Sequence, residues 1–118
     1  MNNKCISNDE LSLTKSAYLD MEIFAIYLND MYIGNISISL DSNNVSYYIL
    51  RRFRNQGYAT KALTLLIKLF QTKEYVNIKE ILLTTKKDDI YSQKVILNNG
   101  GILISKANNL NTYVIKIR

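Results

Sequence analysis

The sequence predicts a fold of the α/β (α+β) class, with a mixed, mostly antiparallel sheet, one parallel strand–helix–strand crossover and flanking helices. Three observations predict it. Three β-rich apolar segments follow one another between residues 22 and 50, separated only by short Asn/Asp turns. The hydrophobic period then changes from two to 3.6 over residues 58–71. A further apolar segment, residues 80–85, follows this helix, and that order implies a right-handed parallel crossover.

The first half of the chain is predicted to form an antiparallel meander of three strands. Residues 22–28 are apolar on both faces, which is typical of a central strand. The chain turns at Asn29 and Asp30 into a segment in which apolar and polar residues alternate up to Leu40, as in a half-buried strand. The segment DSNN, residues 41–44, turns the chain again into the third strand, VSYYIL.

The second half is predicted to contain two helices and a closing hairpin. The first helix follows Gly57 and covers the sheet with an apolar stripe, formed by Ala59, Ala62, Leu63, Leu65, Leu66, Leu69 and Phe70. Residues 80–85 then form a short buried strand. A second helix begins near Asp89 and stops at NNGG, residues 98–101, a strong signal for a helix C-terminus. The hairpin strands are residues 102–106 and 112–117.

Composition and charge exclude several classes of function. The chain of 118 residues has no histidine, which excludes His-based metal sites and Ser-His or Cys-His catalysis, and we expect no metal. Its single cysteine, Cys5, has no intramolecular partner for a disulfide, and no segment resembles a signal peptide or a bilayer span. We expect one domain over residues 1–118, in the cytoplasm, without a membrane partner. The net charge of +5 favours an anionic ligand.

The segment RRFRNQGYAT, residues 51–60, places three arginines beside the start of the first helix, with no acidic residue among them. The helix dipole is already positive at that end, so this charge is unfavourable unless an anion binds. Free backbone N–H groups at a helix start bind phosphate oxygens, and Gly57 and Ala59 allow a close approach. A solvated basic loop with Gly57 as a turn residue is the alternative. The loop matches neither a Walker loop nor a dinucleotide fingerprint.

Two motifs resemble those of the GNAT N-acetyltransferase superfamily, and the resemblance covers roughly residues 20–118. RNQGYA, residues 54–59, is similar to the Arg/Gln-x-x-Gly-x-Gly/Ala signature between a strand and a helix. DDIYSQKVILNNGG, residues 88–101, resembles the Asn-x-x-Ser segment that opens the next helix, with Asp89 at the Asn position and Ser92 at the Ser position. The order and spacing of the two motifs also fit the family.

The resemblance implies transfer of an acetyl group from acetyl-coenzyme A to a primary amine of a small molecule or peptide, by direct attack in a ternary complex. It also implies that loop amides hold the pyrophosphate and that the pantetheine arm lies along Tyr47–Leu50, where this strand splays from the next. A backbone N–H of the strand then polarises the thioester carbonyl. The residues implied for cofactor binding are Ile49, Leu50, Arg51, Arg54, Asn55, Gln56, Gly57, Tyr58, Ala59, Thr60, Asp89 and Ser92.

The catalytic residues do not follow from the resemblance. Many members have a tyrosine four residues after the motif serine as general acid, and Ile96 stands there in this sequence. Tyr91 is the one candidate in its place, with an aromatic packed on the sheet as the alternative. Many members also carry a glutamate base on the central strands, which VSYYIL and EILLTT lack internally. Asp89 is favoured as a helix N-cap.

The N-terminal region also departs from the family, whose members usually have a strand and two helices before the hairpin. About twenty residues precede Glu22, and the segment at residues 8–19 is expected to form one short helix after Asn8 or Asp9, or part of a strand. We therefore expect an acceptor site that is truncated, completed by a partner subunit or unusually open. A homodimer is left open for the same reason.

Two other functions are left open by the sequence. One is a degenerate GNAT fold that binds coenzyme A without transferring a group. The other is a basic nucleic-acid-binding module that uses the arginines with Tyr47, Tyr48 and Phe53. The modest charge, and the alternation of the tyrosines on a strand whose two faces are both expected to be buried, speak against a nucleic acid partner. If the arginines serve a bound anion, Arg54→Gln should leave the ligand-free protein equally or slightly more stable, and reduce its stabilisation by coenzyme A.

Overall fold

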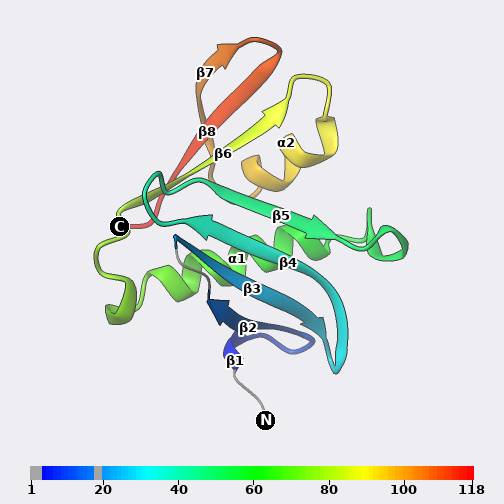
Figure 1. Ribbon diagram of the computed structural model, residues 1–118. Helices are drawn as coiled ribbons and strands as arrows, with labels where there is room; N and C mark the ends of the chain where they lie inside the picture. Colours follow the sequence, from blue (N-terminus) through cyan, green and yellow to red (C-terminus); the bar gives the residue numbers. More distant parts are fainter. Residues whose placement is uncertain (1–3, 18–19) are drawn as a thin grey trace.

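The computed structural model describes residues 4–17 and 20–118, and it confirms a mixed α/β fold with mostly antiparallel strands (Figure 1). The strands are β1 (Lys4–Ser7), β2 (Leu11–Ala17), β3 (Met21–Leu28), β4 (Met31–Ser39), β5 (Val45–Ile49), β6 (Glu80–Lys86), β7 (Ile102–Ala107) and β8 (Leu110–Lys116). The helices are α1 (Tyr58–Phe70) and α2 (Ile90–Leu97), with short 3₁₀ turns η1 (Arg51–Phe53) and η2 (Lys73–Tyr75). One sheet has the order β1-β2-β3-β4-β5, and the other has the order β6-β8-β7.

The predicted hairpins are present, and asparagine makes their turns. Asn29 has a φ of 57° between β3 and β4, and Asn43 has a φ of 60° between β4 and β5. Asn108 and Asn109 have φ values of 55° and 65°, and they are the two residues between the paired ends of β7 and β8. Positive φ at both central residues is the geometry of the tight hairpin turn that matches strand twist, and asparagine tolerates it.

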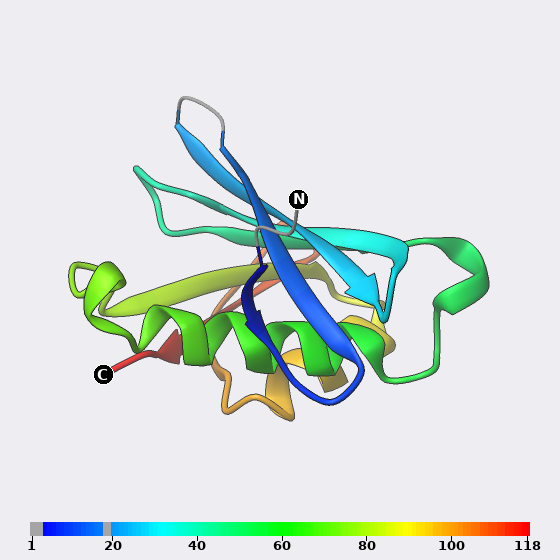
Figure 2. The ribbon, with the colours of Figure 1, turned by 90° about the horizontal axis from the view of Figure 1, so that it is seen from below.

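Helix α1 lies across one face of the five-stranded sheet, as its apolar stripe predicts (Figure 2). All seven residues of the predicted stripe are buried. Phe70 packs edge-on against Phe24 of β3, with ring centroids 6.4 Å apart. Burial of this stripe against apolar strand residues is the main source of stability for a helix of this length. Within the described part of the chain, neither helix has the length and apolar character needed to cross a bilayer.

Helix α2 begins and ends where the sequence predicts. Asp89 is its N-cap, and its C-terminus is closed by the glycine pair: Gly100 N–H donates to Leu97 O (3.1 Å) and Gly101 N–H donates to Ile96 O (3.0 Å). This bonding pattern is the Schellman motif, and Gly100 supplies the required left-handed residue with a φ of 84°.

A polar clamp fixes the end of α2 to the first turn of α1. Thr64 Oγ1 donates to Asn99 Oδ1 (2.6 Å), and Asn99 Nδ2 donates to Thr60 O (3.2 Å) and Val95 O (3.1 Å). The amide of Asn99 therefore joins carbonyl groups from both helices. The clamp sets the position of the α1 start relative to α2.

The two sheets meet at one parallel bridge, between Asn44 and Leu82. Leu82 N–H donates to Asn43 O (3.0 Å), and Asn43 Nδ2 donates to Glu80 O (3.0 Å). The bridge confirms that β5 and β6, which are connected through α1, run parallel. Among the described residues their pairing is confined to this bridge, and the strands diverge beyond it (Figure 1).

The short helix expected after Asn8 or Asp9 is wrong, and the strand alternative is confirmed by β2. Asn8 Oδ1 accepts the N–H groups of Glu10 (3.0 Å) and Leu11 (2.7 Å), so this side chain closes a turn between β1 and β2 instead of capping a helix. β2 then pairs with β3 along its whole length. The last two residues of the expected segment, 18 and 19, lie outside the described residues.

Two predictions of burial are wrong. Leu40 is 44% exposed, because β4 ends at Ser39, where the N–H of Ser39 donates to Asn44 O and closes the turn. The strand at residues 80–85 is only half buried: Ile81, Leu83 and Thr85 face the core, whereas Thr84 is exposed. The reason is that burial alternates along β6, so one face of the strand packs on the core while the other, which carries Thr84, faces solvent.

The junction makes a testable contribution to stability. We expect Asn43→Gly to lower the free energy of unfolding by about 1 kcal/mol, because glycine keeps the positive φ and loses the hydrogen bond to Glu80 O. Asn43→Ala should cost about 1–2 kcal/mol more, since alanine must also adopt the left-handed conformation. Chemical denaturation of the two variants measures both effects, and equal stability of Asn43→Gly and wild type would contradict a role for this bond.

Candidate active site

A cleft lies between β5 and β6 beyond their bridge, and two adjoining hollows form it. The strand-side hollow is lined mainly by β5, β6 and α2, including Val45, Thr85 and Ile96. The loop-side hollow is lined by the end of β5, the loop before α1 and the start of α2. Tyr47, Asp89 and Ser92 line both hollows, so the cleft is continuous.

β5 presents an unpaired backbone edge to this cleft. On its other edge, β5 pairs with β4 in the register Gly34↔Ile49, and Leu50 N–H donates to Ile33 O (2.8 Å). Because backbone groups alternate in direction along an antiparallel pair, the N–H and C=O groups of Tyr47 and Ile49 point toward β6. The N–H groups of these two residues are therefore free to bind a ligand that lies along the strand.

The loop before α1 provides a row of free backbone amides. Gly57 is the N-cap of α1 in the left-handed conformation, with φ 85° and ψ 2°, and no side chain caps this helix. The first amide to donate into the helix is Lys61, which bonds to Gly57 O (3.1 Å). Between Asn55 and Thr60, no backbone amide donates a hydrogen bond to any described residue. A β-carbon on Gly57 would meet no atom within 4 Å, so open space lies beside these amides.

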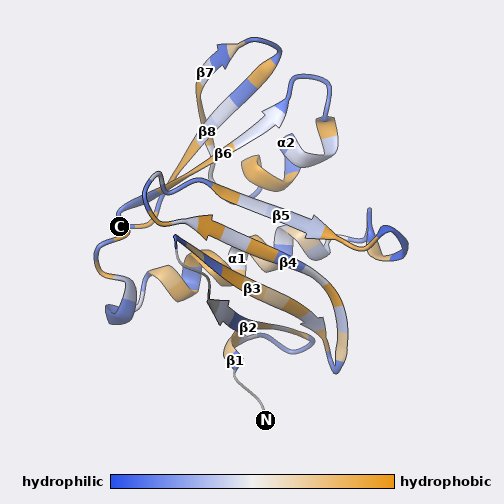
Figure 3. Ribbon diagram, in the orientation of Figure 1, coloured by the Kyte–Doolittle hydropathy of each residue, from blue (hydrophilic) through white to orange (hydrophobic). Residues whose placement is uncertain are grey.

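The three arginines of this mostly hydrophilic loop (Figure 3) do not converge on one point. Arg54 lines the loop-side hollow, where its Nε donates to Ile49 O (2.7 Å) and its guanidinium lies over the Tyr48 ring, 5.1 Å from the centroid. Arg52 lies over Phe53 instead, 5.0 Å from the ring centroid. Arg51 is exposed in η1 and lines neither hollow. Arg54 is thus both a charged group of the cleft and a structural contact of β5.

The start of α2 forms the wall of the cleft opposite β5. Asp89 Oδ1 accepts the N–H of Ser92 (3.1 Å), so Asp89 caps the helix as its residue type predicts, while it also lines both hollows. Tyr91 is 37% exposed and, of the two hollows, lines only the loop-side one. Ile96, at the position of the family tyrosine, is buried and lines the strand-side hollow.

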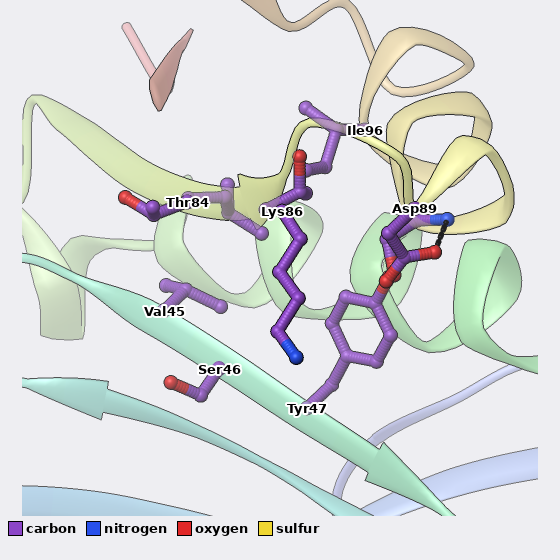
Figure 4. A pocket seen from close by; sticks show the side chains of 10 residues that line it. Val45, Ser46, Tyr47, Thr84, Lys86, Asp89 and Ile96 are labelled. Atoms are coloured by element: carbon purple, nitrogen blue, oxygen red, sulfur yellow. Dashed lines mark hydrogen bonds between the residues drawn. The ribbon is translucent and has the colours of Figure 1, made fainter. Parts of the chain in front are cut away.

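Two buried hydroxyl groups in the strand-side hollow make no hydrogen bond to a described residue: Tyr47 OH and Thr85 Oγ1. The Tyr47 ring points from β5 toward the start of α2, with its hydroxyl on the side of Asp89 (Figure 4). Burial raises the pKa of the Tyr47 hydroxyl above its ordinary value, a contact with Ser92 opposes the shift, and the charge of Asp89 adds to it. The contact with Ser92 does not reach hydrogen-bond geometry. Buried polar groups normally have partners, so these two indicate a place for a polar ligand.

Sequence analysis did not identify Thr85 and Lys86 as residues of the cleft. Lys86 extends from the end of β6 into the space between the strands (Figure 4) and lines the strand-side hollow. Thr85 and Lys86 are the last two residues of β6 and precede Asp89 by a few positions. Their closeness to this motif is the only feature of the sequence that could have placed them in the cleft. Asp89 is the sole carboxylate among the described residues that line the two hollows.

The structure brings together five of the twelve residues expected at the cofactor: Ile49, Arg54, Ala59, Asp89 and Ser92 line the loop-side hollow. The other seven line neither hollow, and they are Leu50, Arg51, Asn55, Gln56, Gly57, Tyr58 and Thr60. Five of those seven, Asn55, Gln56, Gly57, Tyr58 and Thr60, belong to the amide row, where their backbone is the group that a ligand would meet; the side chain of Arg51 is exposed in η1.

The order of elements, the diverging parallel strands and the amide row agree with the comparison with known families. The model of the acetyltransferase (GNAT) domain matches residues 6–102 of the 118. This chain belongs to the GNAT acetyltransferase family. No curated protein matches the sequence of this GNAT protein significantly.

Solved structures of other acetyltransferases share the fold of this GNAT protein. The ribosomal L7/L12 alpha-N-protein acetyltransferase RimL, in complex with coenzyme A, is 17% identical, with a TM-score of 0.68 over 81% of this chain and 62% of that one. The N-acetyltransferase PseH of Campylobacter jejuni, in complex with acetyl coenzyme A, is 12% identical, with a TM-score of 0.71 over 84% and 70%. The microcin C7 self immunity acetyltransferase MccE, in complex with acetyl-CoA and AMP, is 16% identical, with a TM-score of 0.71 over 92% and 93%. This chain therefore spans less than two thirds of RimL.

The aromatic residues of the nucleic-acid alternative do not form one platform in this GNAT protein. Tyr47 and Tyr48 are consecutive residues of β5 and so point to opposite faces of the sheet. Phe53 packs against Tyr58, with ring centroids 6.4 Å apart, and Arg52 covers it. A stacking surface for successive bases would need these rings on one face.

The contact between Arg54 and Ile49 O changes the expectation for the ligand-free protein. We now expect Arg54→Gln to lower its free energy of unfolding by about 0.5–1.5 kcal/mol, because the hydrogen bond at the end of β5 is lost. Arg54→Lys should destabilise it by a similar amount, since lysine keeps the charge but has no planar donor at this position. Thermal melting measures both variants, with Arg52→Gln as the control for loss of one charge. Wild-type stability in both Arg54 variants would contradict a structural role.

Proposed function

We propose that this protein is an acetyl-CoA-dependent N-acetyltransferase that moves an acetyl group to a primary amine by direct attack in a ternary complex. The observation that carries the proposal is a cleft lined by two sets of free hydrogen-bonding groups, with a third set, the amide row, meeting its loop-side end at Ala59. These sets are the unpaired edge of β5, the amide row before α1, and the buried hydroxyls of Tyr47 and Thr85. Membership of the GNAT family and the ligands of RimL, PseH and MccE support it.

Each part of coenzyme A has a proposed position along the cleft, from the amide row to β5. The pyrophosphate would be bound by the amides from Asn55 to Thr60, because free N–H groups at a helix start attract phosphate oxygens and the dipole favours the negative charge. Arg54 would add charge from the side of β5, and Arg51 from the rim. The pantetheine arm would lie along β5 at Tyr47–Leu50, with Asp89 and Ser92 on its other side.

The two unpaired hydroxyls are the strongest local support for a polar arm in the cleft. A buried hydroxyl without a partner costs about 1–3 kcal/mol, and a ligand that supplies the partner removes this cost. The pantetheine arm carries amide groups that both donate and accept hydrogen bonds. It therefore fits the neighbourhood of Tyr47 and Thr85 better than an apolar ligand would.

The chemistry that the cleft supports is positioning together with a fixed dipole at the carbonyl oxygen. A backbone N–H of Tyr47 or Ile49 would donate to the thioester carbonyl, where negative charge develops during attack. Asp89 Oδ1 accepts the N–H of Ser92, which ties this carboxylate to the start of α2, and we propose that the attacking amine loses its proton to water. Holding both reactants in one cleft then supplies most of the acceleration.

We propose that the acceptor amine enters from the face of the sheet opposite α1. Both helices lie on one side of β3, β4 and β5 (Figure 2), and the described N-terminal residues form the β1–β2 hairpin and not helices that could cover the other side. Lys86 brings a positive charge to this opening, which disfavours an approaching ammonium ion and favours a neutral amine or one that carries a negative group. The acceptor is a small-molecule or peptide amine.

Gly57 and Gly100 form a matched pair that tests the cofactor site. Their φ values are 85° and 84°, and a β-carbon on either residue meets no atom within 4 Å. Valine at either position should therefore cause a similar loss of stability through backbone strain. Only Gly57→Val should also weaken coenzyme A binding, by at least about tenfold, because the side chain would occupy the space beside the amide row. Titration calorimetry of the folded variants measures the affinities; equal affinities would remove the proposed phosphate site.

An acetylation assay separates transfer from binding alone. Wild-type protein with acetyl-CoA should acetylate at least one amine of a panel that contains a peptide N-terminus, a lysine peptide, a polyamine and an aminoglycoside. Coenzyme A binding without any transfer would favour the degenerate fold. Binding of single-stranded RNA with a steep salt dependence, and no binding of coenzyme A, would favour the nucleic-acid alternative.

A further inference from the structure

Acetyl transfer from a thioester requires a proton for the sulfur atom that leaves. Helix α2 offers no acid in the strand-side hollow at position 96, where the side chain is isoleucine. Tyr91 lines only the loop-side hollow and is partly exposed. The donor in the strand-side hollow must therefore come from another element.

Tyr47 has its backbone and its side chain directed at the same cleft. Its N–H group points to the free edge of β5, on the evidence of the β4–β5 register. Its hydroxyl is buried, lies on the side of Asp89 and makes no hydrogen bond to a described residue (Figure 4). A thioester whose carbonyl oxygen is bound at the edge of β5 has its sulfur one bond from the carbonyl carbon. The sulfur would then lie beside the residue that carries this hydroxyl.

We propose that Tyr47 is the catalytic general acid of this enzyme, acting from β5 in place of a residue on α2; this assignment rests on the acetyl transfer proposed above. In the step, the bond between the acceptor nitrogen and the acetyl carbon forms, and the bond between that carbon and sulfur breaks. The sulfur takes the proton of the Tyr47 hydroxyl as it leaves. Tyr47 regains a proton from water, and the proton lost by the amine goes to water, so that the protons balance.

The surroundings of Tyr47 suit a donor and not an acceptor of protons. Burial raises the pKa of its hydroxyl, which therefore stays protonated at neutral pH and is available in every turnover. The hydroxyl makes no hydrogen bond to a described residue that would have to break first. Thr85 and Ser92 also present hydroxyls to the hollow, but an aliphatic hydroxyl is a far weaker acid than a phenol. Lys86 is the rival donor, and it is exposed at the end of β6.

Tyr47→Phe removes only the hydroxyl and leaves the ring that fills the cleft. We expect kcat to fall by about 100-fold or more, the usual contribution of a general acid, with little change in the KM for the amine. Tyr75→Phe is the matched control, because Tyr75 is also a buried tyrosine but lies in η2, beyond the C-terminal end of α1, and lines neither hollow, so this variant should keep wild-type kcat. Lys86→Met tests the rival donor: a comparable loss of kcat in Lys86→Met, with Tyr47→Phe unaffected, would overturn the assignment.

Binding provides a readout that does not depend on turnover. The Tyr47 hydroxyl should make wild-type protein bind coenzyme A more tightly than desulfo-coenzyme A, which lacks the sulfur atom. Tyr47→Phe should lose this difference and bind the two ligands equally in titration calorimetry. A purely structural tyrosine would instead weaken both ligands by the same factor. An unchanged difference in Tyr47→Phe would also overturn the proposal.

The stability of Tyr47→Phe also distinguishes a catalytic role of the hydroxyl from a structural one. Tyr47→Phe should melt at the same temperature as wild type or higher, because it removes a buried hydroxyl that has no partner. A large fall in melting temperature would assign the hydroxyl a structural role and would overturn the proposal. If wild-type protein binds neither ligand, the proposed acetyl transfer fails and this inference fails with it. If wild type binds and acetylates while Tyr47→Phe behaves like wild type, only the inference fails.

Discussion

The parallel bridge between Asn44 and Leu82 is the contact on which the rest of the site depends. Two parallel strands side by side would normally exchange hydrogen bonds along their whole length, which would close the edge of β5. Here the exchange stops at the bridge, and Asn43 secures it through its carbonyl and its side-chain amide. The bridge keeps the two sheets together while it leaves the backbone of Tyr47 and Ile49 unpaired. One contact therefore both adds to the cohesion that the shared core provides and leaves the opening that a ligand needs.

The interactions around this opening serve two purposes at once. Arg54 ties the loop to the last carbonyl of β5 while it supplies charge, and Asp89 caps α2 while it lines the cleft. Because Arg54 and Asp89 both stabilise the fold and line the cleft, this chain of 118 residues needs few residues that serve the site alone. For the same reason, the stability of any Arg54 or Asp89 variant must be measured together with its activity, since a loss of activity could follow from a loss of folded protein.

Sequence reasoning succeeded where the cause of a structure is local. The stripe of α1, the Asn turns and the Gly100 stop of α2 are fixed by spacing and by residue type, and each is present. It failed where the cause is a distant partner: the exposure of Leu40 depends on where β4 ends, and the exposure of Thr84 depends on which face of β6 is covered by the core. The same holds for the site. The motif residues of the loop could be found from their order, whereas the unpaired hydroxyl of Tyr47 depends on which side chains of α2 come close to it.

The clamp between Asn99, Thr60 and Thr64 has a consequence for the thermodynamics of binding. It attaches the end of α2 to the first turns of α1, so the helix that closes the amide row at Thr60 is joined to the helix of the far wall before any ligand arrives. Ordering a flexible loop on binding consumes part of the interaction energy, and a site that is already rigid avoids that loss. The protein is thus preorganised: its affinity for a flexible, highly charged ligand would be limited mainly by the entropy of the ligand itself.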